Sequence, residues 1–146
     1  MALYKFTQAI LQNKKIEVFN HGNHMRDFTY IDDIVLGIIK VIDSPAKKNP
    51  NWKSNNPSSD SSNAPWRIYN IGNNKKINLI EYITALETEL NMKAKKEFLP
   101  MQKGDVPDTH ADVSELASEF DYHPNTSIQM GIKKFVSWFK FYHQIS

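Results

Sequence analysis

Three observations predict a mixed α/β fold for this chain. Apolar residues recur at helical spacing in several long stretches, and shorter runs rich in β-branched and aromatic residues lie between them. The chain has 146 residues, of which 40% are hydrophobic, so it is long enough for one domain that buries roughly 68–70% of its unfolded surface. We therefore expect a few short strands separated by about five helices.

The N-terminal third alternates helices with extended segments. Residues 2–13 are predicted to form a helix because their apolar residues fall on one side. Residues 15–20 (KIEVFN) have the composition of a strand that enters a turn. Residues 27–30 are expected to be extended, and residues 31–42 to form the next helix.

The remainder repeats this alternation. Residues 67–71 (RIYNI) are predicted to form a strand before a glycine turn, Asn78 can cap the helix that follows, and residues 95–99 indicate a further strand. Two capping-box patterns predict a short helix and a long last helix, namely Asp112 with Glu115 and Thr126 with Gln129.

The predicted helix 31–42 (IDDIVLGIIKVI) is apolar almost all round, with Asp32, Asp33 and Lys40 as its polar residues. A chain with so few short strands can hardly cover such a helix. One interpretation is a central helix in the core of a compact domain. The other is that one side packs against protein outside this chain.

Composition excludes several classes of function. Without cysteine there are no disulfides, thiolate metal sites or cysteine nucleophiles. A net charge of +2 and the short basic run at residues 93–96 are typical of a solvated surface rather than a nucleic-acid site. No apolar stretch is long enough for a membrane span, and we expect a cytoplasmic protein. Residues 43–65, with four prolines and many Ser and Asn residues, predict a long polar loop.

The segment 22–34 (GNHMRDFTYIDDI) places Arg26 between a predicted strand and a predicted helix, close to three carboxylates. A guanidinium can give two parallel hydrogen bonds to a phosphate, so this junction suits a phosphorylated ligand. A structural ion pair of Arg26 with Asp27, Asp32 or Asp33 fits the residue types equally well. Residue types alone leave both interpretations open.

Other chemical motifs are missing. The five glycines are too widely spaced for a dinucleotide or nucleoside-triphosphate phosphate loop, and no Gly-x-Ser-x-Gly nucleophile turn is present. His21 and His24 lie three residues apart in a predicted turn, which supplies too few ligands for a metal site. Asp32 and Asp33 would point to different sides of their helix, so dipole compensation explains them better than shared acid/base chemistry.

Three ordered motifs carry a family resemblance: RDFTYIDDI at 26–34, RIYNIGNN at 67–74 and MQKGDVPDTHAD at 101–112. They resemble the C-terminal, substrate-binding part of extended short-chain dehydrogenase/reductase nucleotide-sugar epimerases, most closely the UDP-glucuronate 4-epimerases. The resemblance runs from about residue 2 to residue 142. Thr109 agrees with the glucuronate branch, because glucose/galactose epimerases usually carry a tyrosine at the matching position.

The resemblance also implies what this chain lacks. In that family an N-terminal Rossmann domain holds NAD through a glycine-rich turn, and a Ser/Thr with Tyr-x-x-x-Lys carries out the hydride and proton transfers. No tyrosine of this chain has a lysine four places later. We therefore expect no catalytic and no cofactor-binding residue in this chain, and no epimerase activity of the chain alone, while NAD belongs to the complete family enzyme.

The site residues implied by the resemblance bind the nucleotide. Arg26 would bind the diphosphate of a UDP-sugar, Phe19 would lie against the uracil, and Asp105 would accept hydrogen bonds from the ribose or orient a neighbouring phosphate-binding residue. Gln102 stands where some relatives carry a second diphosphate-binding arginine. From the residues alone, Phe19 is equally a strand core residue and Asp105 a turn carboxylate that bonds to the backbone.

Three hypotheses about function remain open. The first is the UDP-sugar-binding portion of an epimerase that works with the missing Rossmann domain. The second is a non-enzymatic fragment that self-associates or docks through the apolar helix 31–42, with a homo-oligomer as one form. The third, a basic nucleic-acid-binding module, has the least support in the sequence, and we expect neither a nucleic acid nor a membrane as a partner.

Overall fold

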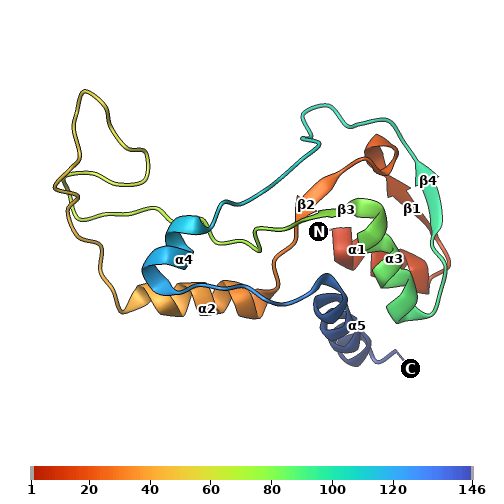
Figure 1. Ribbon diagram of the computed structural model, residues 1–146. Coiled ribbons are helices and arrows are strands. Elements are labelled where there is room, and N and C mark those ends of the chain that lie inside the picture. The colour runs from red at the N-terminus through yellow and green to blue at the C-terminus, as the bar shows by residue number, and fades with distance from the viewer. Residues whose placement is uncertain (1, 146) are drawn as a thin grey trace. The chain divides into compact units, whose positions relative to one another are not determined.

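A computed structural model describes residues 2–145, which form two compact units (Figure 1). Unit 1 contains residues 2–28, 75–110 and 126–145. Unit 2 contains residues 29–74 and 111–125. Each unit has its own cluster of buried apolar residues, so each is described separately.

Unit 1 combines helices with two small sheets. Parallel strands β1 (Lys15–Val18) and β4 (Lys95–Phe98) form one sheet, and antiparallel strands β2 (Met25–Asp27) and β3 (Lys76–Asn78) form the other. The helical elements of unit 1 are α1 (Ala2–Leu11), the short 3-10 helix η1 (Phe19–Gly22), α3 (Leu79–Leu90) and α5 (Ile128–His143). The helices predicted at these positions and the strands β1 and β4 are confirmed, although β1 ends at Val18, where η1 begins. The extended segment predicted at 27–30 lies instead at 25–27, and the short β3 was not predicted.

The core of unit 1 explains why these segments are ordered. Strand β1 buries Ile16 and Val18 and exposes the residues between them, as expected of a strand covered on one face. Helices α3 and α5 pack against each other, and the same core receives Ile10 from α1. The apolar positions at helical spacing in α3, namely Ile83, Leu86 and Leu90, are all buried.

The caps of two helices differ in part from the predicted ones. The Asn78 side chain accepts a hydrogen bond from the backbone N–H of Ile80 at 2.8 Å, as expected for the start of α3. At the start of α5, however, the cap is Ser127, which accepts from the N–H of Met130, and not Thr126. Thr126 and Ser127 both carry a hydroxyl that can cap a helix, so the sequence could not show which of them caps α5.

Glu87 in α3 is a buried carboxylate, only 4% exposed. Its Oε1 accepts hydrogen bonds from Lys96 Nζ at 2.5 Å and from the Ala94 N–H at 2.8 Å, and Lys93 lies 3.6 Å from Oε2. Burial by itself raises the pKa of Glu87, but these hydrogen bonds and the two lysine charges lower it on balance. The carboxylate thereby joins α3 to the connection that leads into β4.

Unit 2 is built from α2 (Ile31–Ile42), α4 (Ser114–Phe120) and a long connection that includes the predicted polar loop 43–65. Tyr122 is fully buried and donates its hydroxyl to the Gly72 carbonyl at 3.0 Å. A Cβ at Gly37 would lie 3.1 Å from the Tyr122 ring, so glycine permits this close approach of α2. The Asp112 carboxylate accepts from the Ser114 N–H, although the residue next to α4 is Val113, which provides no side-chain cap.

Helix α2 is not a core helix, contrary to one interpretation of its sequence. Its two buried residues are Asp33 and Gly37. Six large apolar side chains are between 42% and 70% exposed: Ile31, Val35, Leu36, Ile38, Ile39 and Ile42. A face of this size without cover is unusual for a protein surface and typical of a surface that another protein contacts.

Residues 67–71 form no strand, although their composition predicts one. The segment makes a single isolated bridge, between Arg67 and Ser61, and Ile68 is 56% exposed. A β-branched run becomes a strand only when another strand supplies hydrogen-bond partners. Among the described residues no strand lies beside residues 67–71, so this segment has no partner strand with which to form a ladder of hydrogen bonds.

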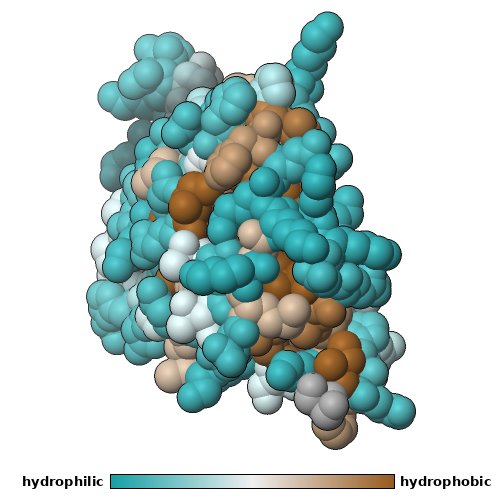
Figure 2. Space-filling view, turned by 90° about the vertical axis from the view of Figure 1, so that its right-hand side faces the viewer, coloured by the Kyte–Doolittle hydropathy of each residue, from teal (hydrophilic) through white to brown (hydrophobic). Residues whose placement is uncertain are grey.

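Unit 1 also has apolar residues on its surface. Figure 2 shows apolar patches between hydrophilic side chains on the face seen from the right of Figure 1. Exposed large apolar residues of unit 1 include Phe98, Trp138 and Phe141, the last at 85%. The face of α2 is therefore not the only part of the described residues where apolar side chains are exposed.

Candidate functional site

The first wall of the candidate site is a tight reversal between β1 and β2. Asn20, His21 and Gly22 have successive positive φ values of 51°, 50° and 84°. At Gly22 a Cβ would lie 2.5 Å from Ile80 Cδ1, so this position requires glycine both for its backbone angle and for space. The reversal places Phe19 and Arg26 beside the same cavity.

The second wall is the segment 105–109, which runs along β2. The Met25 N–H donates to the Pro107 carbonyl at 3.0 Å, and the Thr109 N–H donates to the Met25 carbonyl at 3.1 Å. The Thr109 hydroxyl accepts from the Asp27 N–H at 3.4 Å. These bonds bring Asp105 opposite Arg26, although the two residues are far apart in the sequence.

Arg26 makes an ion pair, but with a different partner from those expected. Its Nη2 lies 3.1 Å from Asp105 Oδ1, and its Nη1 donates to the carbonyls of Met25 and Pro107, each at 3.0 Å. Within unit 1 the carboxylate that takes this role is therefore Asp105 and not the neighbouring Asp27. The bonds use three of the five guanidinium N–H groups, which leaves donor capacity for a ligand on a side chain that is 23% exposed.

A cavity of about 320 Å³ lies between these walls. Phe19, Arg26 and Asp105 all line it, so the structure brings three of the four expected site residues together. Gln102 does not line it; this residue is exposed, and its carbonyl accepts from the Asp105 N–H at 3.2 Å. The other lining residues are Ala2, Phe6, Glu17, His24, Asp27, Phe28, Leu79 and Thr109.

The cavity has an apolar wall and an acidic balance of charge. Phe28 stacks on Tyr82 with ring centroids 4.1 Å apart, which holds one aromatic wall in place. Burial raises the pKa of the Tyr82 hydroxyl, so this ring stays neutral at ordinary pH. The cavity lining contains the positive charge of Arg26 and the carboxylates of Glu17, Asp27 and Asp105. A phosphorylated ligand therefore depends on Arg26 for attraction.

His24 is a cavity residue that the sequence did not single out. It is only 3% exposed and lies with its Nε2 3.4 Å from Asp105 Oδ2. In the sequence it looked like half of an incidental His-x-x-His pair in a polar turn. His24 is buried by contacts with segments that are distant in the sequence, and no local sequence pattern predicts these contacts.

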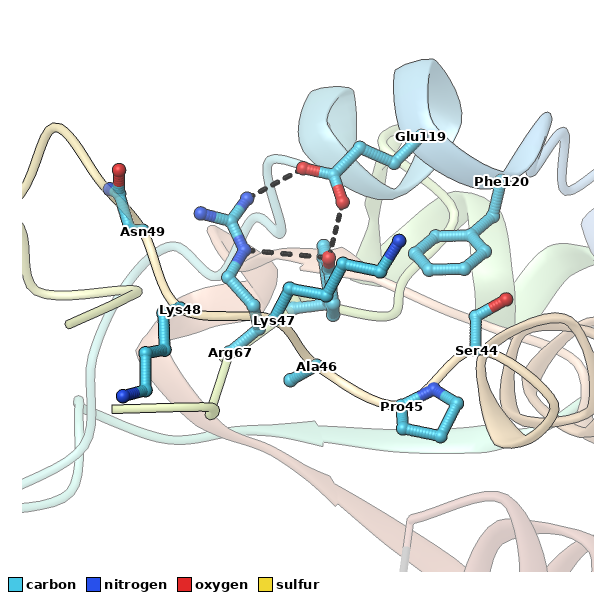
Figure 3. A pocket seen from close by; sticks show the side chains of 10 residues that line it. Ser44, Pro45, Ala46, Lys47, Lys48, Asn49, Arg67, Glu119 and Phe120 are labelled. Atoms are coloured by element: carbon cyan, nitrogen blue, oxygen red, sulfur yellow. Dashed lines mark hydrogen bonds and ion pairs between the residues drawn. The ribbon is translucent and has the colours of Figure 1, made fainter. Parts of the chain in front are cut away.

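A second cavity, of about 380 Å³, lies in unit 2 beside the other arginine of the chain (Figure 3). Arg67 is held by Asp60 at 2.7 Å and by Glu119 at 2.7 Å, and Tyr69 also donates to Glu119. Burial, followed by the bond to Glu119, raises the pKa of the Tyr69 hydroxyl. These carboxylates already neutralise the charge of Arg67, which holds the connection against α4. The cavity beside Arg26 is therefore the better candidate site.

The described part of the chain has neither a candidate metal site nor a candidate membrane span. Residues 2–145 contain no group of three or more His, Cys, Asp or Glu side chains that could hold a metal ion. No helix among them is long and apolar enough to cross a membrane.

Residues 2–135 match the family described as GDP-mannose 4,6 dehydratase. The chain is 46% identical over 144 residues to protein CapI of Staphylococcus aureus, with 99% of this chain and 43% of CapI covered. It is 40% identical over 147 residues to UDP-glucuronate 4-epimerase 1 of Arabidopsis thaliana, with 98% of this chain and 33% of that protein covered. The chain thus spans less than half the length of these relatives.

Solved structures show the same relationship. The UDP-glucuronic acid 4-epimerase from Bacillus cereus, in complex with UDP-glucuronic acid and NAD, matches with a TM-score of 0.76 and 26% identity, covering 97% of this chain and 40% of that chain. The predicted mixed α/β fold and the resemblance to nucleotide-sugar epimerases are confirmed. The chain belongs to the GDP-mannose 4,6 dehydratase family and corresponds to a part of its UDP-glucuronate 4-epimerase relatives.

Proposed function

We propose that this chain forms the UDP-sugar-binding part of an NAD-dependent nucleotide-sugar 4-epimerase that interconverts UDP-glucuronate and UDP-galacturonate. The observation that carries the proposal is the single cavity that Phe19, Arg26 and Asp105 line together. These are the residue types that a pyrimidine ring, a diphosphate and a ribose need. The likeness to UDP-glucuronate 4-epimerases supports the choice of sugar.

Each residue would have a distinct role. The Phe19 ring would lie against the uracil, and the free N–H groups of Arg26 would bind the diphosphate through charge-assisted hydrogen bonds. Asp105 would orient Arg26 through Oδ1 while Oδ2 faces the ribose hydroxyls or His24. Gln102, an uncharged residue outside the cavity lining, would leave Arg26 as the main source of positive charge.

This division of labour suits an epimerase. In the complete enzyme NAD would take a hydride from C4 of the sugar and return it to the other face of the ring. The sugar must turn between the two transfers, so its nucleotide has to be held firmly and the sugar loosely. An arginine and an aromatic ring at the nucleotide would satisfy the first part of that requirement.

Titration of the chain with UDP and with uridine tests the proposal. Because three carboxylates surround one arginine, we expect a weak UDP complex, with Kd of about 0.1–1 mM, and at least about tenfold weaker binding of uridine, which lacks the diphosphate. Ligand-detected NMR measures affinities in this range. Equal affinities for UDP and uridine, or no saturable binding, would contradict the assignment.

The same chain should not turn over substrate. With NAD and UDP-glucuronate we expect no UDP-galacturonate above the level of a protein-free control, because the chain contains no Tyr-x-x-x-Lys pair. Product formation in step with the amount of purified chain would refute this part of the proposal.

A second candidate function rests on the exposed face of α2. We infer that this face docks protein, either the remainder of a complete family enzyme or a second copy of this chain. Six exposed apolar side chains on one helix support the inference. Relatives of this chain are more than twice as long, which supports the remainder of a complete family enzyme as the partner.

Light scattering distinguishes the two partners of α2. If copies of this chain pair through α2, the measured mass should rise with concentration above 16.9 kDa, and the double substitution Ile38→Asp and Ile39→Asp should restore the monomer mass. Phe141→Asp, at another exposed apolar position, serves as the control and should leave the association unchanged. A wild-type chain that stays monomeric at all concentrations would contradict self-association.

A further inference from the structure

His24 is the most buried polar residue of the cavity beside Arg26. It lies in the connection between η1 and β2, its side chain is 4% exposed, and its carbonyl accepts from the Leu79 N–H at 2.9 Å. The backbone is therefore fixed by the neighbouring strand and helix. The imidazole reaches the cavity wall from a rigid position.

Neither ring nitrogen of His24 has a hydrogen-bond partner among residues 2–145. An imidazole always carries at least one N–H donor, and a buried donor without a partner is unfavourable. An apolar side chain of similar size would fill the same space without that cost. The imidazole is therefore better explained by a polar contact that a small movement within the site completes.

Asp105 is the group placed to make that contact. Its Oδ1 already accepts from Arg26 Nη2 at 3.1 Å and from the Val106 N–H at 2.8 Å. Its Oδ2 faces His24 Nε2 at 3.4 Å, so a movement of roughly 0.5 Å would produce a normal hydrogen bond. The other charged groups at the cavity, Glu17 and Asp27, have no such contact with the His24 ring.

We propose that His24 is a positioning residue of the UDP site: its Nε2–H holds Asp105 Oδ2, and Asp105 in turn holds the Arg26 guanidinium with its free N–H groups toward the diphosphate. The ligand in this inference rests on the proposed function. Without His24 the carboxylate is fixed on the Oδ1 side only. Asp105 can then rotate, and Arg26 loses the orientation in which it meets the ligand.

Two substitutions separate positioning from packing. His24→Met fills the space but cannot donate, whereas His24→Gln keeps an N–H donor at about the place of Nε2. We expect His24→Met to weaken UDP binding about five- to tenfold and His24→Gln to remain within about twofold of wild type. Thermal unfolding of both variants measures folding. Equal affinity of His24→Met and wild type, or equal losses in Met and Gln variants, would overturn the proposal.

A double-mutant cycle tests the route through Asp105. In an Asp105→Asn background, His24→Met should produce no further loss of UDP affinity, because the carboxylate that it positions is already gone. Independent, additive losses would show that His24 acts without Asp105 and would refute the inference.

NMR of the free chain separates this inference from the proposed function. With 15N-labelled histidine, Asp105→Asn should shift the ring nitrogen resonances of His24 and leave those of the exposed His123 unchanged. If wild type does not bind UDP but this shift occurs, the proposed function fails and the positioning contact stands. An unchanged His24 spectrum overturns the positioning contact whatever UDP does.

Discussion

Arg26→Ala is expected to weaken UDP binding about 10- to 100-fold while the chain remains folded. The free N–H groups of Arg26 would make charge-assisted hydrogen bonds to the diphosphate, and such bonds contribute about 1.5–3 kcal/mol. Among the described lining residues there is no lysine or second arginine, so none of their side chains can replace the lost charge. Ligand-detected NMR with UDP measures the change, and thermal unfolding checks the fold.

Two controls make this result specific. Arg26→Lys keeps the charge but loses the planar fork, so it should fall between wild type and Arg26→Ala. Lys14→Ala removes one positive charge at an exposed position between α1 and β1, outside the cavity, and should leave UDP affinity within about twofold. If Lys14→Ala weakens UDP as much as Arg26→Ala does, general charge rather than the site governs binding. Uridine should bind Arg26→Ala and wild type alike, because it has no diphosphate.

The second large effect concerns stability. Glu87→Leu is expected to lower the free energy of unfolding by about 2–4 kcal/mol at pH 7. The substitution leaves the Ala94 N–H without its acceptor and Lys96, whose side chain is 22% exposed, without its partner. Urea unfolding measures the loss. Glu89→Gln, at an exposed position of the same helix, should change it by less than about 0.5 kcal/mol.

The Glu87 carboxylate also predicts the direction of a pH effect. Its folded pKa lies below the unfolded value, so its contribution is complete above the unfolded pKa of about 4.5 and disappears as the pH falls through the folded pKa. Wild type should therefore lose more stability than Glu87→Gln between pH 6 and the acid end of the range. Parallel pH profiles of the two proteins would contradict this origin of the stability.

The helices could be predicted from the sequence because their signals are local. Periodic apolar residues gave the bounds of α2, and Asn78 marked the start of α3. Arg26 was likewise proposed from its short-range context and Phe19 and Asp105 from the family resemblance, and these three residues line one cavity, while their role in binding stays a prediction. In all these cases the informative residues lie within a few positions of one another or within one motif.

Long-range pairing is what the sequence could not supply. Within unit 1 the partner of Arg26 is Asp105 and not the neighbouring Asp27, because β2 bonds to the segment 105–109. His24 looked like a polar turn residue because its burial depends on contacts with distant segments. The composition of residues 67–71 favours a strand, but no strand lies beside them among the described residues. A local pattern indicates which secondary structure a segment prefers. Its contacts with other segments depend on the whole fold.

The antiparallel pairing of β2 with β3 has a consequence for how this protein can vary. Asp27 lies opposite Lys76, so the chain leaves unit 1 and returns to it at adjacent positions, and residues 29–74 are inserted between them. Doubling the length of a flexible insertion adds only about 0.6 kcal/mol of closure entropy. The polar loop within this insertion can therefore grow, shrink or change composition at little cost to the cavity beside Arg26. In such an arrangement the inserted segment and the cavity-bearing unit can evolve separately.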